Sequence, residues 1–195
     1  MSKEPRANIS ADGLGTSIAA LPKKGLPPVH LWNPAYCGEM DMRIARDGTW
    51  YHDGTPIGRA PMVKLFSSIL KREGDRFYLV TPVEKLGIQV EDAPFLATDF
   101  TASGSGRAQQ LTFFTKTEDT VLAGPDHAIR VARDAATGEP SPYVHVRGGM
   151  DALIDRKTFY RLVDLGVQED VDGTLWFGVW SANVFFPMIP SADLS

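Results

Sequence analysis

The 195-residue chain is poor in cysteine, in clustered charge and in long apolar runs. Its single cysteine, Cys37, cannot close an internal disulfide, which excludes a disulfide-stapled fold and fits a reducing compartment. Because free cysteines are usually buried and no histidine motif accompanies this one, we interpret Cys37 as a small buried side chain. No stretch approaches the roughly 20 apolar residues of a membrane-spanning helix.

The charges and the histidines argue against two further classes of function. With 20 Lys and Arg against 24 Asp and Glu, the net charge is −4, so nucleic acid is not an expected partner. The four histidines lack the spacing of a metal site, and we expect neither a metal nor a cofactor; they are His30, His52, His127 and His145. The first residues, MSKEPRANISADG, have no apolar core, so no signal peptide is expected and we predict a cytoplasmic protein without a membrane partner.

Residues 42–82 read as one folding unit. Period-two alternation indicates strands, and Asp-Gly pairs are typical of two-residue hairpin turns because Gly tolerates positive φ. Apolar residues at helical spacing behind a proline predict a helix. In chain order, strands, turns and helix are predicted at 42–46, Asp47-Gly48, 49–51, Asp53-Gly54, 61–70, 73–75 and 77–80.

The rest of the chain is predicted to be mostly strand. Strands are expected at 96–103, 109–117, 128–133, 143–147 and 175–180, with a short one near 88–90, and helices at 16–21 and 156–165. So few helices among so many strands indicate a β-rich α+β fold of mostly antiparallel sheet or roll, rather than a parallel βαβ sheet.

The chain resembles itself at an offset of 97 residues (154 minus 57). This offset places PIGRAPMVKLF over LIDRKTFYRLV, so that Arg59 meets Arg156 and Asp75 meets Asp172. Each copy reads hairpin, helix, acidic turn, aromatic strand. We therefore predict two small lobes built from this repeated hairpin–helix–strand motif: an N-terminal arm at 1–28, a first lobe at 29–95 and a second lobe at 96–195.

The repeated arginine, Arg59 and Arg156, stands at the predicted start of each helix. A helix N-terminus carries partial positive charge, so a cation there is unfavourable by roughly 0.3–1 kcal/mol. Either a bound anion or a neighbouring carboxylate should offset this cost, the candidate carboxylates being Asp47, Asp53 and Asp155. Aromatic side chains could line a ligand pocket or form core; these are Trp50, Tyr51, Tyr78, Trp176 and Trp180.

Three stretches resemble a known family: PPVHLWNP, CGEMDMRIARDGTWYHDGTPIGR and LVTPVEKLGIQVEDAPF. They are similar to the bacterial, mainly proteobacterial, family called domain of unknown function 1285, and the resemblance is looser in the C-terminal half. The resemblance implies a two-lobed, β-rich fold and no established activity, with a suggested role in ligand sensing or signal transduction. The family pattern falls on Asp47, Gly48, Trp50, Gly54, Pro56, Ile57, Arg59, Pro82, Val83 and Glu84. Turns and core readily explain Gly48, Gly54, Pro56 and Ile57, but not Trp50, Arg59 and Glu84.

We therefore expect a non-enzymatic binding or sensory module that takes a small anionic ligand near the junction of the lobes. The expected ligand-binding residues are Arg59 and Arg156 as anion contacts, Trp50 as a wall, and Glu84. No catalytic residue is assigned, since neither a nucleophile elbow nor a phosphate-binding loop is present. Two alternatives stay open: an adaptor that binds a protein through a strand edge or its Pro-rich arm, and a small hydrolase or transferase that uses Glu84 or Asp53 as a base.

Overall fold

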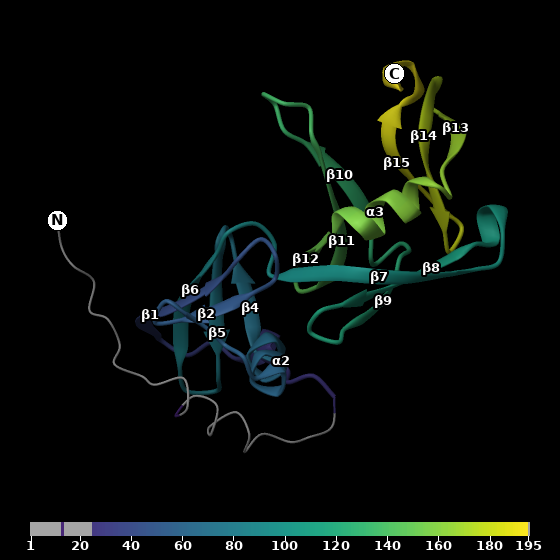
Figure 1. The fold of residues 1–195 in the computed structure, drawn as a ribbon. Coiled ribbons are helices and arrows are strands. Elements are labelled where there is room, and N and C mark those ends of the chain that lie inside the picture. The colour runs from purple at the N-terminus through teal and green to yellow at the C-terminus, as the bar shows by residue number, and fades with distance from the viewer. Residues whose placement is uncertain (1–12, 14–24, 195) are drawn as a thin grey trace. The chain divides into compact units, whose positions relative to one another are not determined.

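The computed structural model describes residue 13 and residues 25–194. The helix predicted at 16–21 and most of the predicted arm lie outside the described residues. The chain divides into two compact units, and the division falls between Asp92 and Ala93. Figure 1 labels α2, α3 and most of the strands of both units, and each unit is described by itself below.

Unit 1 is built on a six-stranded sheet in the order β3-β2-β1-β6-β5-β4. Neighbouring strands are antiparallel except for the central pair, β1 and β6, which is parallel. The helix α2 connects the two three-stranded halves of this sheet. The elements are η1 (Val29–Leu31), β1 (Tyr36–Ile44), β2 (Trp50–His52), β3 (Thr55–Pro56), α2 (Ala60–Ser68), β4 (Leu70–Glu73), β5 (Arg76–Val80) and β6 (Lys85–Val90).

The two Asp-Gly pairs of unit 1 form different turns. Asp53 and Gly54 both have positive φ, +48° and +73°, and make the predicted two-residue turn between β2 and β3. Asp47 and Gly48 do not form such a two-residue turn. The Gly48 amide donates to the Ala45 carbonyl, so the central residues of the turn are Arg46 and Asp47, and Gly48 follows them with φ +76°. The two-residue prediction at Asp47-Gly48 is therefore wrong, and the longer loop is the one that a left-handed residue after the turn permits.

The helix of unit 1 also ends earlier than its apolar spacing predicts. The hydroxyls of Ser67 and Ser68 donate to carbonyls three residues back, at distances of 2.7 Å and 2.6 Å. Such bonds compete with the helical pattern. Leu70, predicted in the helix, instead begins β4 and pairs with Leu79 of β5.

The core of unit 1 lies between α2 and one face of the sheet. Phe66 of α2 is fully buried and stacks on Trp50 of β2, with ring centres 6.4 Å apart and an interplanar angle of 20°. Side chains on the same face of the other strands complete this core: Met42, Ile44, Leu79, Leu86 and Ile88. Because strand residues alternate between faces, the opposite face carries the polar side chains.

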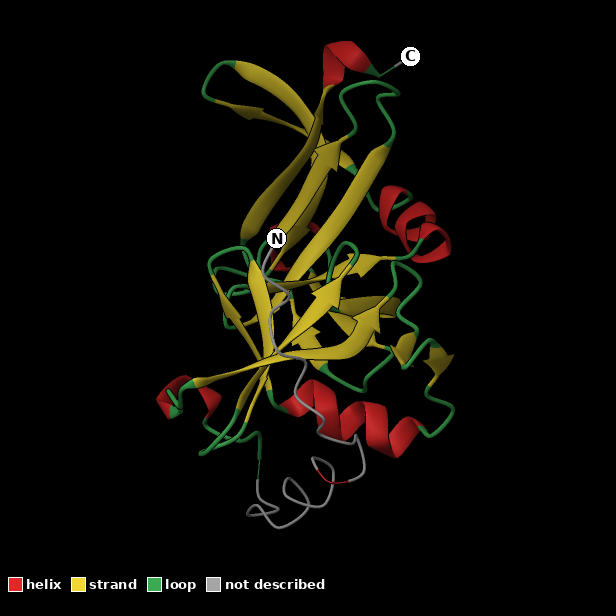
Figure 2. Cartoon of the chain, turned by 90° about the vertical axis from the view of Figure 1, so that its left-hand side faces the viewer, coloured by secondary structure: helices red, strands yellow, loops and turns green. Residues whose placement is uncertain are grey.

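Unit 2 contains a second six-stranded sheet, in the order β10-β11-β12-β7-β8-β9, and a three-stranded sheet, β13-β14-β15. Its elements are β7 (Phe95–Ser103), η2 (Gly106–Ala108), β8 (Gln110–Thr115), β9 (Thr120–Leu122), β10 (Ile129–Arg133), β11 (Pro140–Arg147), β12 (Met150–Ile154), α3 (Arg156–Val163), β13 (Val167–Val171), β14 (Thr174–Ser181), β15 (Val184–Pro190) and η3 (Ser191–Asp193). Figure 2 shows that strands, in yellow, far outweigh helices, in red. Six strands escaped prediction: β3, β4, β9, β12, β13 and β15.

The two six-stranded sheets have the same topology. In each, the first and last strands in sequence form the central parallel pair, β1 with β6 and β7 with β12. A second likeness follows the predicted offset: β3-α2-β4-β5-β6 and β12-α3-β13-β14-β15 share one order of helix and strands. The β-rich, mostly antiparallel α+β fold with two lobes and a repeated hairpin–helix–strand motif is confirmed.

The core of unit 2 is rich in aromatic and branched side chains. Phe113 is fully buried and packs at 5.5 Å from the ring of Phe100, and Leu162 anchors α3 with no exposed surface. Ser181 is also fully buried, and its hydroxyl joins the two sheets by accepting from the Leu111 amide and donating to the Ala123 carbonyl.

Cys37 is exposed, so its interpretation as a buried side chain is wrong. It lies near the start of β1, where the strand has not yet entered the core, and its thiol is 3.3 Å from the Ala35 carbonyl. Within residue 13 and residues 25–194, no helix has the length and apolar character needed to cross a membrane.

Candidate functional site

The predicted anion contact Arg59 lies at the N-terminus of α2. Its backbone is extended (φ −95°, ψ 99°), and its carbonyl accepts from the amides of Met62 and Val63 at 3.0 Å and 3.2 Å. No side chain among the described residues caps this end, and the first turn holds no acidic residue. The side chain is exposed, with one guanidinium nitrogen 3.9 Å from the sulfur of Met62. A full positive charge therefore stands beside the positive end of the helix dipole.

The second predicted contact, Arg156, begins α3 in a different setting. Asp155 caps this helix, because its carboxylate accepts from the Thr158 amide at 2.8 Å. Arg156 itself donates to Glu139 at 2.8 Å, and both side chains are largely exposed. The carboxylate that pairs with Arg156 is thus Glu139, whereas Asp155, one of the predicted partners, serves the backbone.

Trp50, predicted as a wall of the ligand site, is 2% exposed and forms core under α2 through its stack on Phe66. Its carbonyl accepts from the amide of Ile57 at 2.8 Å, which ties the segment before Arg59 to the strand β2. The remaining predicted aromatics lie in both units: Tyr51 and Tyr78 on β2 and β5, Trp176 and Trp180 on β14. Their role in a pocket stays a prediction.

The two carboxylates considered as bases occupy turns. Glu84 is half-buried in the connection between β5 and β6, where its amide donates to the Thr81 hydroxyl at 3.0 Å. Asp53 stands in the turn between β2 and β3, with its side chain 75% exposed and 3.5 Å from the Nε2 atom of His52. Their roles in binding or catalysis stay predictions.

The polar face of the sheet in unit 1 carries a network of cations and tyrosines that sequence reasoning missed. Arg76 pairs with Glu39 and lies 5.4 Å from the ring centres of both Tyr36 and Tyr78. The hydroxyl of Tyr36 and the charge of Glu39 raise the pKa of Arg76. These partners are up to 40 residues apart, and only strand pairing brings them together.

The same network includes the carboxylate of Glu73. It lies 2.9 Å from the ammonium of Lys85 and 3.4 Å from that of Lys71. The hydrogen bond from Lys85 lowers the pKa of Glu73, although partial burial opposes this effect. Since each charge in this group has an opposite charge in contact, we interpret the network as structural support of the sheet.

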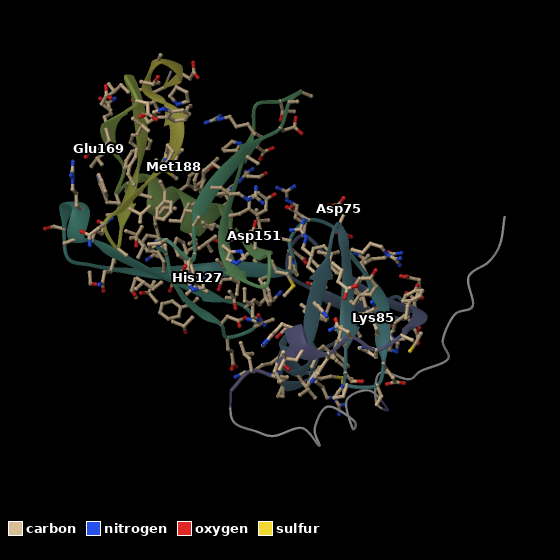
Figure 3. All side chains as sticks on the ribbon, turned by 180° about the vertical axis from the view of Figure 1, so that it is seen from behind. Asp75, Lys85, His127, Asp151, Glu169 and Met188 are labelled. Atoms are coloured by element: carbon tan, nitrogen blue, oxygen red, sulfur yellow. The ribbon has the colours of Figure 1, made fainter. Side chains whose placement is uncertain are left out.

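A second missed cluster lies on β10, β11 and β12 of unit 2 and includes His127, which precedes β10. Asp151 accepts from Arg130 through two bonds, of 2.8 Å and 3.0 Å, and lies 3.1 Å from the Nδ1 atom of His145. Arg130 covers the ring of Tyr143 at 4.1 Å. His127 places its Nδ1 atom 3.0 Å from the His145 carbonyl. Figure 3 labels His127 and Asp151 on this unit.

Within the part of the chain that the structure describes, no group of three or more His, Cys, Asp and Glu side chains is placed to hold a metal ion. A site of the common structural type, with four protein ligands, therefore has no candidate among these residues.

Both halves of the chain match family models. Residues 27–93 match the domain of unknown function DUF1285, N-terminal domain, and residues 94–188 match the protein of unknown function DUF1285, C-terminal domain. No curated protein matches the chain.

Two solved structures are similar to this chain. A DUF1285 family protein from Silicibacter pomeroyi DSS-3, a crystal structure at 2.50 Å resolution, is 62% identical, with 95% of this chain and 99% of that chain covered and a TM-score of 0.85. A DUF1285 family protein from Shewanella baltica OS155, at 1.40 Å resolution, is 29% identical, with 64% of this chain and 91% of that chain covered and a TM-score of 0.51.

Proposed function

We propose that this chain, which belongs to the DUF1285 family of unknown function, is a sensory binding module that takes a small anionic ligand at the start of α2. The observation that carries the proposal is the state of that helix end. It combines an exposed arginine with a first turn that has no acidic residue and no capping side chain among the described residues.

The chemistry of this end suits a phosphate or carboxylate group. Arginine binds such groups through paired hydrogen bonds, and the partial positive charge of a helix N-terminus adds to the attraction. A bound anion would interact favourably with the partial positive charge of this helix end, a contribution of roughly 0.3–1 kcal/mol. The ligand thus supplies at α2 the negative charge that Asp155 supplies at α3.

The other predicted residues take secondary parts in this proposal. Arg156, in unit 2, would be a separate and weaker anion contact, because an anion must compete there with Glu139 for its guanidinium. Trp50 acts from beneath, by holding Phe66 and so the position of α2. Glu84 would accept a hydrogen bond from a hydroxyl or amine of the ligand, since a carboxylate repels the anionic group itself.

The test is calorimetric titration of the full chain with inorganic phosphate, pyrophosphate and citrate at constant ionic strength. We expect Arg59→Gln to weaken binding by about tenfold, the loss of roughly one charge-assisted hydrogen bond. Lys64→Gln is the matched control, because Lys64 carries the same charge on an exposed position of the same helix. Equal affinity in Arg59→Gln and the unmodified chain would overturn the site, and so would equal losses in both variants.

The two alternative functions predict different results for the same protein and the same probes. An adaptor should bind none of the three probes. A hydrolase should turn over a phosphate ester or carboxylic ester, with the rate lost in Glu84→Gln or Asp53→Asn while the thermal melt is unchanged.

A further inference from the structure

Two histidines of unit 2 are held in a defined ring orientation. The Nδ1 atom of His127 lies 3.0 Å from the His145 carbonyl, and the Nδ1 atom of His145 lies 3.1 Å from a carboxylate oxygen of Asp151. A carbonyl and a carboxylate only accept hydrogen bonds, so each Nδ1 atom carries the proton. In the neutral rings, both Nε2 atoms therefore present a lone pair.

This arrangement is the one that metal-binding histidines use. Such a histidine donates its second ring N–H to a carboxylate or a backbone carbonyl, which fixes the ring and raises the basicity of the coordinating nitrogen. His145 has the carboxylate form of this support and His127 the carbonyl form. Imidazole nitrogen is a preferred ligand of zinc, copper and nickel.

The separation of the two rings is compatible with a shared ion. Their centres are 6.1 Å apart and their planes differ by 25°. With metal–nitrogen bonds of about 2.0–2.1 Å, two imidazoles on one ion have ring centres roughly 5 Å apart at a tetrahedral angle and about 6.5 Å apart when opposed. The observed separation falls between these limits.

The strands supply the positions. His145 and Asp151 are direct partners in the register of β11 and β12, so their side chains share one face. The His145 amide donates to the Ala128 carbonyl at 2.9 Å. Ala128, the sequence neighbour of His127, is thereby held beside β11. The side chains of His145 and Asp151 are 30% and 20% exposed, so the cluster is reachable from solvent.

Asp151 is occupied as a support rather than as a ligand. One of its oxygens faces His145 and the other accepts both bonds from Arg130. The charge of Arg130 is thereby matched, which lowers its repulsion of a cation nearby. An ion here would have two protein ligands and would complete its coordination with water or an added anion.

We propose that His127 and His145 bind one late first-row divalent cation, of the class of Zn²⁺, Ni²⁺ or Cu²⁺, through their Nε2 atoms. Asp151 is the positioning residue that fixes the ring of His145. The open positions of such an ion would make it a site for an exogenous ligand, independent of the anion site proposed at α2.

The chain offers a matched control in His52. Its Nδ1 atom lies 3.0 Å from the Asp41 carbonyl, the same support that His127 has. The ring of His127 contacts that of His145. Among the described residues, no histidine ring contacts the ring of His52. His52, whose Nε2 atom lies 3.5 Å from the Asp53 carboxylate rather than beside a second imidazole, can thus be compared with the supported pair.

The experiment is calorimetric titration of the full chain, freed of metal with a chelator, using Zn²⁺, Ni²⁺ and Cu²⁺ salts. We expect His127→Asn and His145→Asn each to weaken binding by at least about tenfold and Asp151→Asn by about 10–100-fold, while His52→Asn stays within about twofold. Cu²⁺ electron paramagnetic resonance should show two coordinating nitrogens in the unmodified chain and one in either of the first two variants.

A measurement on the unmodified chain guards against variants that fail to fold. On addition of Zn²⁺, the ring ¹⁵N resonances of His127 and His145 should shift while those of His30 and His52 do not. Absence of binding by all three ions, equal affinity of His127→Asn and the unmodified chain, or equal shifts of all four histidines would overturn the proposal.

Discussion

The helices α2 and α3 come from aligned segments of the sequence, yet they complete their N-termini in different ways. At α3, Asp155 caps the backbone and Glu139 pairs with Arg156. At α2 the equivalent arginine, Arg59, is itself the cap residue, and Pro61 follows in the first turn. The one-residue difference in where the helix begins decides whether the arginine lies at the cap or within the first turn. A repeated motif can therefore preserve a fold while its two copies cap their helices differently.

The largest expected effect concerns how each helix is anchored. Phe66 of α2 and Leu162 of α3 are both fully buried. We expect Phe66→Ala to cost about 3–5 kcal/mol and Leu162→Ala about 2–5 kcal/mol, because each leaves a cavity in a packed core. Loss of the stack on Trp50 adds about 0.5–1.5 kcal/mol to the first.

Hydrogen exchange resolved by peptide can assign these losses to each unit. Phe66→Ala should raise exchange in β4–β6 and Leu162→Ala in β13–β15. A cost below about 1 kcal/mol for Phe66→Ala would contradict the view that Trp50 and Phe66 hold α2 in place.

The next effect in size is an exchange of caps. Asp155→Ala removes the side chain that accepts from the Thr158 amide and should cost about 1 kcal/mol. Arg59→Ser does the reverse at α2, because it replaces a cation by a residue suited to capping, and we expect it to stabilise by up to about 1 kcal/mol. Both are measured by urea denaturation without added anion. A destabilised Arg59→Ser variant would show that Arg59 has a structural role at this end.

Local patterns carried much of the fold. Helical spacing placed α2, alternation placed β1, and aromatic and apolar runs placed β5 and β14, because these signals depend on neighbours in sequence. Short strands with polar residues were missed: β13 reads VQEDV and has one apolar residue at each end. The end of α2 was also missed, since the hydroxyl bonds of Ser67 and Ser68 decide it rather than the apolar spacing.

The candidate sites depend on contacts that no local pattern encodes. His127 and His145 are 18 residues apart, and the pairing of β10 with β11 brings them together. The partner of Arg156, Glu139, is 17 residues away across a hairpin loop, whereas the sequence suggested the adjacent Asp155. Asp155 is adjacent to Arg156 in the sequence, but its carboxylate accepts a hydrogen bond from the Thr158 amide at the start of α3.

The smallest effect expected is that of the ion pair between Arg156 and Glu139. Their side chains are 73% and 62% exposed, so water screens their charges and the pair must be held against side-chain entropy. A double-mutant cycle with Arg156→Ala and Glu139→Ala should give a coupling energy of about 0–1 kcal/mol by urea denaturation. A coupling well above this range would mean that α3 depends on Glu139 as much as on its cap. The two helices would then differ in how the arginine is held as well as in how the backbone is capped. Arg156 would be bound too firmly to Glu139 to serve as a second anion contact.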